Sequence, residues 1–265
     1  MSMNSIRRVT TVVAIAGAAA LVAPAFGHAA DAGSLGSLGS LGSLGSAEAP
    51  VAGFTCDALS TEATPAGWGV PFEDEQDQKA SYSAENVLDE NGSLALSVEE
   101  KTDRQAWYHS AGSVELADVI GKDIGFAEKA ESSKAAFQLR LLGTTGGKFE
   151  NGFTTLVWTA GADAPDTKDG AVHEKLQDGL WWSTQDIDGA KNRKPVTLEE
   201  IAEANPGATV EHYGVSIGSG SENASTLVDA VRFNGCTTDF AKKDAEPEPA
   251  GSLGSSGALF GSLGS

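Results

Sequence analysis

The chain has 265 residues, and its 37 acidic residues against 18 basic ones give a formal net charge of −19 at pH 7. A surface of this charge repels nucleic-acid phosphates and anionic lipid headgroups, which excludes nucleic acid as a partner and favours cations. The length fits one main domain with a sizeable core.

The first thirty residues have the three parts of a secretory signal sequence. Arg7 and Arg8 form a positive start, the apolar run 9–22 follows, and Pro24 precedes small residues suited to cleavage. The run is shorter than the roughly 20 residues that span a bilayer, and no later segment is apolar enough to do so. We therefore expect a secreted or cell-envelope-associated protein; a permanent N-terminal anchor is the alternative. If cleavage removes residues 1–30, the chain loses two arginines and no acid. The remaining chain has 16 basic and 37 acidic residues and a net charge of −21.

Short repeats lie on both sides of the central region. Residues 33–46 read GSLGSLGSLGSLGS, and the pentapeptide GSLGS returns at 251–255 and 261–265. Because Gly and Ser favour flexible chain, we expect a linker at 31–53 and an acidic, Pro-rich spacer with a GSLGS tail at 241–265. Leucine at every third position exposes apolar surface without a conformational benefit, so a segment that contacts the envelope is the alternative to a spacer.

The two cysteines, Cys56 and Cys236, stand near the ends of the region between the repeats. Export permits a disulfide, and an even count with none left over predicts one. Closing so long a loop would stabilise the fold by about 5 kcal/mol in the chain-entropy model. The bond would also make the first and last strands of the domain neighbours.

Alternating apolar residues predict half-buried strands at 93–98, 135–142, 211–217 and 226–233. Residues 153–158 are apolar on both faces, which predicts a central strand.

The segment 135–142 shows the alternation most clearly. Phe137, Leu139 and Leu141 share the predicted inner face, and Gln138 and Arg140 point the other way.

One short helix is predicted from a capping box in which Thr197 and Glu200 cap each other's backbone; Asn205 and Pro206 end it. Many short strands, one helix and no alternation of strands with helices predict an all-β fold. We expect an antiparallel two-sheet β-sandwich of the jelly-roll type, formed by residues 54–240.

Three segments carry a resemblance to a known group of proteins. They are residues 178–184 (DGLWWST), residues 197–206 with the following Tyr213-Gly214-Val215, and residues 228–233 (VDAVRF). Together they resemble secreted actinobacterial β-sandwich proteins, which are similar to carbohydrate-binding and concanavalin-like modules and mostly have no assigned activity. The resemblance covers most of residues 54–240 and implies a fold more than a function.

Catalytic motifs give no positive signal. The histidines of the predicted domain, His109, His173 and His212, form no His-Glu-x-x-His zinc motif, and no Gly-x-Ser-x-Gly elbow is present. His212 is out of phase with Tyr213 and is expected to face away from the core. We therefore predict a non-enzymatic protein.

Asp229 is the acid whose position is most informative. It shares a predicted inner face with Leu227, Val231 and Phe233, where a lone charge would be costly. It needs an arginine, several backbone N–H groups or a metal ion as its partner. A satisfied core carboxylate is one interpretation, and a structural calcium ligand is the other; no other cofactor is indicated.

Tryptophans provide the candidates for ligand contact. Adjacent strand residues face opposite ways, so one of Trp181 and Trp182 is expected to lie outside the core. We select Trp182, Trp107 and Arg104 as a platform on which a sugar ring could stack and form hydrogen bonds. Packing of these tryptophans inside the sandwich is the alternative.

Three functional hypotheses follow. The first is a binding module for cell-wall glycan or another envelope component, which an exposed tryptophan in a groove would support. The second is a structural surface protein that acts through its GSLGS repeats. The third is a polysaccharide-active enzyme, which requires two convergent carboxylates in a cleft.

Overall fold

The computed structural model describes residues 54–75, 77–218 and 220–243. The predicted signal sequence and all GSLGS repeats fall in 1–53 and 244–265, so those predictions lie outside the described residues. Where the structure is described, none of the helices combines the length and the apolar character needed to cross a membrane.

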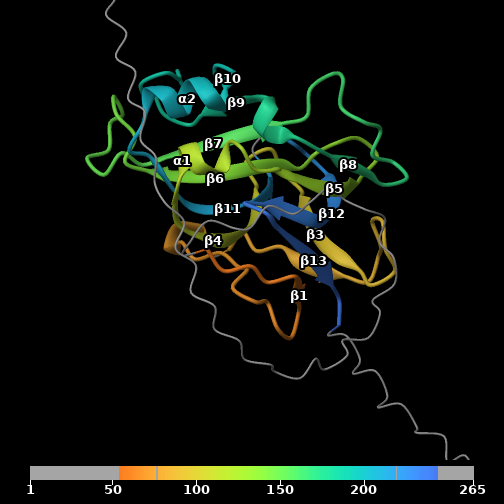
Figure 1. The fold of residues 1–265 in the computed structure, drawn as a ribbon. Helices are drawn as coiled ribbons and strands as arrows, with labels where there is room; N and C mark the ends of the chain where they lie inside the picture. Colours follow the sequence, from red (N-terminus) through yellow and green to blue (C-terminus); the bar gives the residue numbers. More distant parts are fainter. Residues whose placement is uncertain (1–53, 76, 219, 244–265) are drawn as a thin grey trace, which may run out of the picture. The chain divides into compact units, whose positions relative to one another are not determined.

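Two packed β-sheets form the described part of the chain, and this confirms the predicted β-sandwich (Figure 1). The chain passes repeatedly from one sheet to the other, as a jelly roll requires. All strand pairs are antiparallel except β1 with β13. The seven-stranded sheet contains β1 (Leu59–Thr61), β2 (Ser81–Ser83), β3 (Ser93–Val98), β5 (Gly125–Lys129), β8 (Ala171–His173), β12 (Ala224–Phe233) and β13 (Cys236–Ala241). The six-stranded sheet contains β4 (Gln105–Glu115), β6 (Ala136–Leu142), β7 (Thr154–Thr159), β9 (Leu180–Ser183), β10 (Val196–Thr197) and β11 (Thr209–Ile217).

The six-stranded sheet has the order β10-β9-β7-β6-β11-β4. Its strand β7 lies between β6 and β9, and the four residues 154–157 are all buried. This confirms the central strand that the apolar run 153–158 predicted.

Aromatic side chains from both sheets fill the core. The rings of Phe137 and Tyr213 of the six-stranded sheet stack on each other, and the Tyr213 ring also stacks on Phe233 of the seven-stranded sheet with centroids 4.2 Å apart. Each is at most 1% exposed. Burial of a large apolar side chain contributes about 1.5–3 kcal/mol, so these contacts hold the sheets together.

The predicted helix is α2 (Leu198–Ala204), and its capping box is present. The backbone N–H of Glu200 donates to the Thr197 hydroxyl at 3.2 Å, and the Thr197 N–H donates to the Glu200 carboxylate at 3.1 Å. Three further turns were not predicted, because none is long enough to show a helical period: η1 (Glu73–Glu75), α1 (Leu116–Val119) and η2 (Leu176–Asp178).

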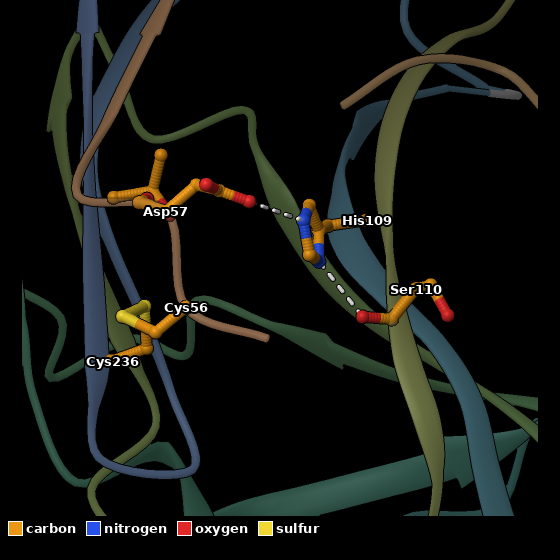
Figure 2. Close-up of a disulfide and its surroundings, with 6 residues drawn as sticks. Cys56, Asp57, His109, Ser110 and Cys236 are labelled. Carbon is orange, nitrogen blue, oxygen red and sulfur yellow. Dashed lines mark hydrogen bonds and ion pairs between the residues drawn. A yellow bond between two sulfur atoms is a disulfide. The ribbon is translucent and has the colours of Figure 1, made fainter. Parts of the chain in front are cut away.

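The predicted disulfide joins Cys56 to Cys236, which are 180 positions apart in sequence and 5.5 Å apart between Cα atoms (Figure 2). The bond ties the segment before β1 to the start of β13, and the parallel pairing of β1 with β13 confirms that the first and last strands are neighbours. The Asp57 carboxylate beside it lies 3.7 Å from Nε2 of His109, whose Nδ1 donates to the Ser110 carbonyl at 2.7 Å.

Strand β12 departs from the prediction at one point. Ala230 has a φ of +46°, and the pairing of β12 with β5 shifts between Asp229 and Arg232. This irregularity inverts the alternation, so Val228 is fully buried and Leu227 is only half-buried. The prediction that Leu227 shares the inner face is therefore wrong, because a local bulge carries no signal in the apolar pattern.

Candidate functional site

The outer face of the six-stranded sheet carries a hollow of about 720 Å³. Strand alternation determines its floor, because residues opposite the core side chains face outward. Gln138 of β6, Val157 of β7 and Trp182 of β9 are partners in adjacent strands, so they form a continuous row across the hollow. The sequence prediction that Gln138 and Arg140 point away from the core is confirmed, and both line the hollow.

Trp181 and Trp182 face opposite sides of β9. Trp181 is fully buried, and its indole N–H donates to the carbonyl of Leu176 at 2.8 Å. Trp182 is half-buried and lines the hollow. The prediction that one of the two lies outside the core is confirmed, and Trp182 is that residue.

The amide of Gln138 is held from both sides. The Tyr108 hydroxyl donates to Gln138 Oε1 at 2.7 Å, and Gln138 Nε2 donates to the Ser216 hydroxyl at 2.6 Å. Asn192, at the border of the hollow, donates from Nδ2 to the Thr184 carbonyl at 2.6 Å. These polar groups are fixed before any ligand arrives, which lowers the entropy lost on binding.

A buried carboxylate organises the arginines of the hollow. Glu75, from η1, is 3% exposed and accepts hydrogen bonds from Arg104 and, at 3.4 Å, from Arg140. The Arg140 guanidinium also lies over the rings of Phe72 and Phe153, at 3.4 and 4.8 Å from their centroids. Among the described residues, Oε2 of Glu75 and Nε of Arg140 have no hydrogen-bond partner. The two arginines are thus positioned by contacts beneath the surface. One acceptor, Glu75 Oε2, and one donor, Arg140 Nε, could still form a hydrogen bond.

Trp107 lies away from the hollow. It is 9% exposed, belongs to the core and meets Tyr82 edge-to-face at 6.2 Å. Its neighbour Tyr108 is also buried: the backbone of Gly69 pairs with Tyr108 along the free edge of β4, and the Phe72 ring meets the Tyr108 ring edge-on with centroids 5.5 Å apart. Of the three selected platform residues, the structure brings Trp182 and Arg104 to one hollow and places Trp107 inside the sandwich.

Most of the polar residues that line the hollow were not among the platform residues predicted from the sequence. Arg140 and Gln138 could have been found, since the alternation of 135–142 already placed both outward. Glu75, Lys134 and Arg193 come from η1 and loops, and no periodic pattern places a loop residue.

A second buried carboxylate fixes the loop that carries Lys134. Glu128 of β5 is fully buried, and its Oε1 accepts from the backbone N–H groups of Lys134 and Ala135, each at 2.8 Å. Its Oε2 lies 2.8 Å from Nε2 of His173. Although burial alone would raise the pKa of Glu128, the hydrogen bonds from His173 and these N–H groups lower it. The charged carboxylate therefore holds the edge of the hollow in place.

Asp229 is buried, 2% exposed, on the opposite sheet. Its Oδ1 accepts from the N–H groups of Ala230 and Phe240, at 2.7 and 2.8 Å. From the sequence, an arginine, several backbone N–H groups or a metal ion was expected as the partner of Asp229. Among the described residues, its hydrogen-bond partners are backbone N–H groups. Burial and the charge of Asp239 raise the pKa of Asp229 to about 8, which exceeds the lowering by these N–H groups.

Two more carboxylates lie next to Asp229. One oxygen each from Asp89, Asp229 and Asp239 lies within 4.8 Å of the others, and we call these three residues the acidic cluster. Asn91 Nδ2 donates to Asp239 at 2.5 Å. Carboxylate oxygens suit calcium in kind, but calcium takes six to eight oxygens, so the cluster would supply part of a coordination shell. Burial, followed by the charge of Asp239, also raises the pKa of Asp89.

In comparisons with known proteins, no family model matches the chain, and no curated protein matches it either. The resemblance to secreted actinobacterial β-sandwich proteins therefore stays a prediction, and any function has to be argued from the hollow itself.

Proposed function

We propose that the described domain is a non-enzymatic glycan-binding module that acts outside the cell, in association with the cell envelope. The observation that carries the proposal is the hollow on the six-stranded sheet, where the half-buried Trp182 stands in one row with the fixed amide of Gln138. A concave site with an aromatic surface and a few immobilised polar groups is typical of small-molecule recognition.

The chemistry of the hollow suits a sugar ring. The C–H face of a pyranose is apolar and packs on an indole, while its hydroxyls are donors and acceptors at the ring edge. Trp182 offers the indole, and Gln138, Asn192 and Thr155 offer polar partners around it. This is the arrangement that the first functional hypothesis requires.

The distribution of carboxylates favours binding over hydrolysis. Among the described residues that line the hollow, Glu75 is the single acid, and its carboxylate is engaged by two arginines. Glycoside hydrolysis uses a pair of carboxylates on either side of the bond that is cleaved. Asp229 and Asp239 are close together but belong to the seven-stranded sheet and do not line the hollow.

The extracellular location rests on two independent features. The first is the predicted signal sequence, and the second is the Cys56–Cys236 disulfide, which persists in oxidising compartments. The alternative, a structural surface protein acting through its repeats, concerns residues outside the described ones; the hollow favours the binding module.

The test is retention of the purified full chain on isolated cell-wall polysaccharide, measured beside two variants. Trp182→Ala removes the proposed stacking surface. Phe149→Ala is the matched control, because Phe149 is an exposed aromatic (40%) that does not line the hollow. The proposal expects retention of the chain and of Phe149→Ala, with loss in Trp182→Ala. Equal retention of all three, or of none, would contradict it.

A further inference from the structure

The charge of the hollow is opposite to that of the protein. The chain carries a net charge of −19, yet the described residues that line the hollow include four basic residues and one acid: Arg104, Lys134, Arg140, Arg193 and Glu75. Charges separated by more than about 8–10 Å are largely screened at physiological ionic strength. A ligand seated in the hollow is therefore governed by these nearby cations rather than by the distant acids.

The single acid does not cancel the positive charge. Glu75 is buried beneath the surface, where it orients Arg104 and Arg140 and compensates one of their two charges. Arg104 remains accessible, with 43% of its side chain exposed. The residual charge of this group faces the hollow.

Among the described residues, the other two cations, Lys134 and Arg193, have no acidic partner. Lys134 and Arg193 are exposed, and no ion pair joins either one to a described residue. Both are nevertheless fixed at the backbone: the N–H of Lys134 is held by Glu128, and the N–H of Arg193 donates to the Ser183 carbonyl at 3.0 Å. Two cationic residues with fixed backbone positions, and with no ion pair to a described residue, therefore stand at the border of the hollow.

Together these observations specify the ligand more narrowly. We propose that the hollow selects acidic saccharides, in which an anionic group, a uronate carboxylate or a phosphate ester, pairs with the cations of the hollow while a sugar ring packs on Trp182. Guanidinium groups present parallel N–H donors that match the oxygens of a carboxylate or phosphate, so Arg104 and Arg193 suit either anion. This inference rests on the proposed glycan-binding function and adds the charge class of the glycan.

The experiment compares two charged polymers with their own neutral forms. Polygalacturonate is set against fully methyl-esterified polygalacturonate, and phosphomannan against the same mannan after removal of phosphate. Affinity electrophoresis of the purified full chain at low and high salt measures the binding. Each pair has the same backbone, so a difference within a pair reports the anion alone, and a difference between the pairs distinguishes carboxylate from phosphate.

Three variants localise the effect. Lys134→Gln and Arg193→Gln each remove one unpaired cation, and Lys168→Gln removes an equal charge from an exposed loop residue that does not line the hollow. We expect each hollow variant to weaken binding of the acidic polymer about fivefold to tenfold, which corresponds to about 1–1.4 kcal/mol. The Lys168→Gln variant should bind as the original chain does. Thermal unfolding checks that all three are folded.

The outcomes separate the inference from the function on which it rests. Binding of an acidic polymer that exceeds its neutral form, falls with salt and weakens in the two hollow variants supports the inference. Equal, Trp182-dependent binding of charged and neutral forms overturns the acidic specificity and leaves the glycan-binding function standing. Binding that all three variants reduce equally also overturns the inference. If neither charged polymer binds, the inference is overturned as well, and the retention of the chain on wall polysaccharide then decides whether the domain binds glycan at all.

Discussion

The hollow and the acidic cluster lie on different sheets of the sandwich and carry opposite charges. The hollow is lined mainly by cations, and the acidic cluster consists of three carboxylates. In the hollow, several cations are held at the surface over one buried acid, Glu75. In the acidic cluster, three carboxylates meet, and no cationic side chain among the described residues pairs with Asp229, whose hydrogen bonds come from backbone N–H groups. The first region is organised so that charge faces outward, toward a ligand. The second compensates its charge internally, with N–H groups and protons.

The net charge of a protein therefore does not predict the charge of its binding site. From its 37 acids alone, the chain is expected to bind cations. The arrangement of β6, β9 and the adjacent loops nevertheless gathers arginine and lysine on one face. The following predictions test whether the two regions act as independently as this comparison implies.

The largest effect is expected from the disulfide, which belongs to the sheet that carries the acidic cluster. Replacing both cysteines, Cys56→Ser with Cys236→Ser, should lower the free energy of unfolding by about 5 kcal/mol, because the loop it closes is long. Chemical denaturation of the full chain, with and without reductant, measures the loss. A denaturation midpoint unaffected by both reductant and mutation would contradict it.

Glu75→Gln should destabilise the fold by about 1–3 kcal/mol, because two arginines lose the carboxylate that pairs them in a buried position. The change also adds one positive charge to the hollow. Denaturation midpoints measure the stability. Glu73→Gln, at an exposed neighbour in the same turn, is the control and should change the midpoint little.

Trp182→Ala should weaken glycan binding at least about tenfold, which is about 1.4 kcal/mol, and leave the stability nearly unchanged because the indole is only half-buried. Titration calorimetry with the retained polysaccharide gives the affinity, and a thermal melt gives the stability. A large loss of stability would contradict this prediction, because it would mean that Trp182 stabilises the core as the buried Trp181 does.

The effect expected in the acidic cluster depends on pH. Because the pKa of Asp229 is raised to about 8 in the folded protein, the folded state keeps a proton that the unfolded state releases above about pH 4. Stability should therefore fall as pH rises from about 4 to about 8 and level off above. Asp229→Asn keeps the acceptor for the two N–H groups and should flatten this dependence, as thermal melts across pH would show.

Calcium provides a second arm of the same experiment. If the three carboxylates of the acidic cluster bind calcium, added calcium should raise the melting temperature most above pH 8, where no proton competes, and chelator should reverse it. A calcium effect that persists in Asp229→Asn would place the ion elsewhere. If calcium has no effect on the melting temperature, the charge of the acidic cluster is compensated by a bound proton and not by calcium.

The sequence predicted the parts of the fold that depend on a regular period. The alternation in 135–142 placed Gln138 and Arg140 outward, and the adjacent pair Trp181 and Trp182 had to divide between the two faces. The capping box defined α2, and the even cysteine count predicted the disulfide. In each case, local backbone geometry alone relates the residue to its environment.

The remaining features depend on contacts between distant segments. Tyr108 is buried beside Trp107 because Gly69 pairs with it at the edge of β4 and the Phe72 ring packs against its ring, and no pattern within β4 predicts these contacts. The bulge at Ala230 inverted the face of Leu227. Glu75 reaches the hollow from a turn far from β6 in sequence. Such residues are placed by tertiary packing, which the alternation of one strand does not encode.

The most direct test of glycan binding in the hollow is a nuclear magnetic resonance titration that observes both regions at once. Polysaccharide fragments are added to the labelled full chain, and the Trp182 indole N–H is assigned with Trp182→Phe. We predict that the signals of the Trp182 indole and the side-chain amides of Gln138 and Asn192 shift with the ligand, while the amide of Asn91, beside the acidic cluster, does not. Shifts at Asn91 without shifts at Trp182 would contradict the assignment of the hollow as the binding site.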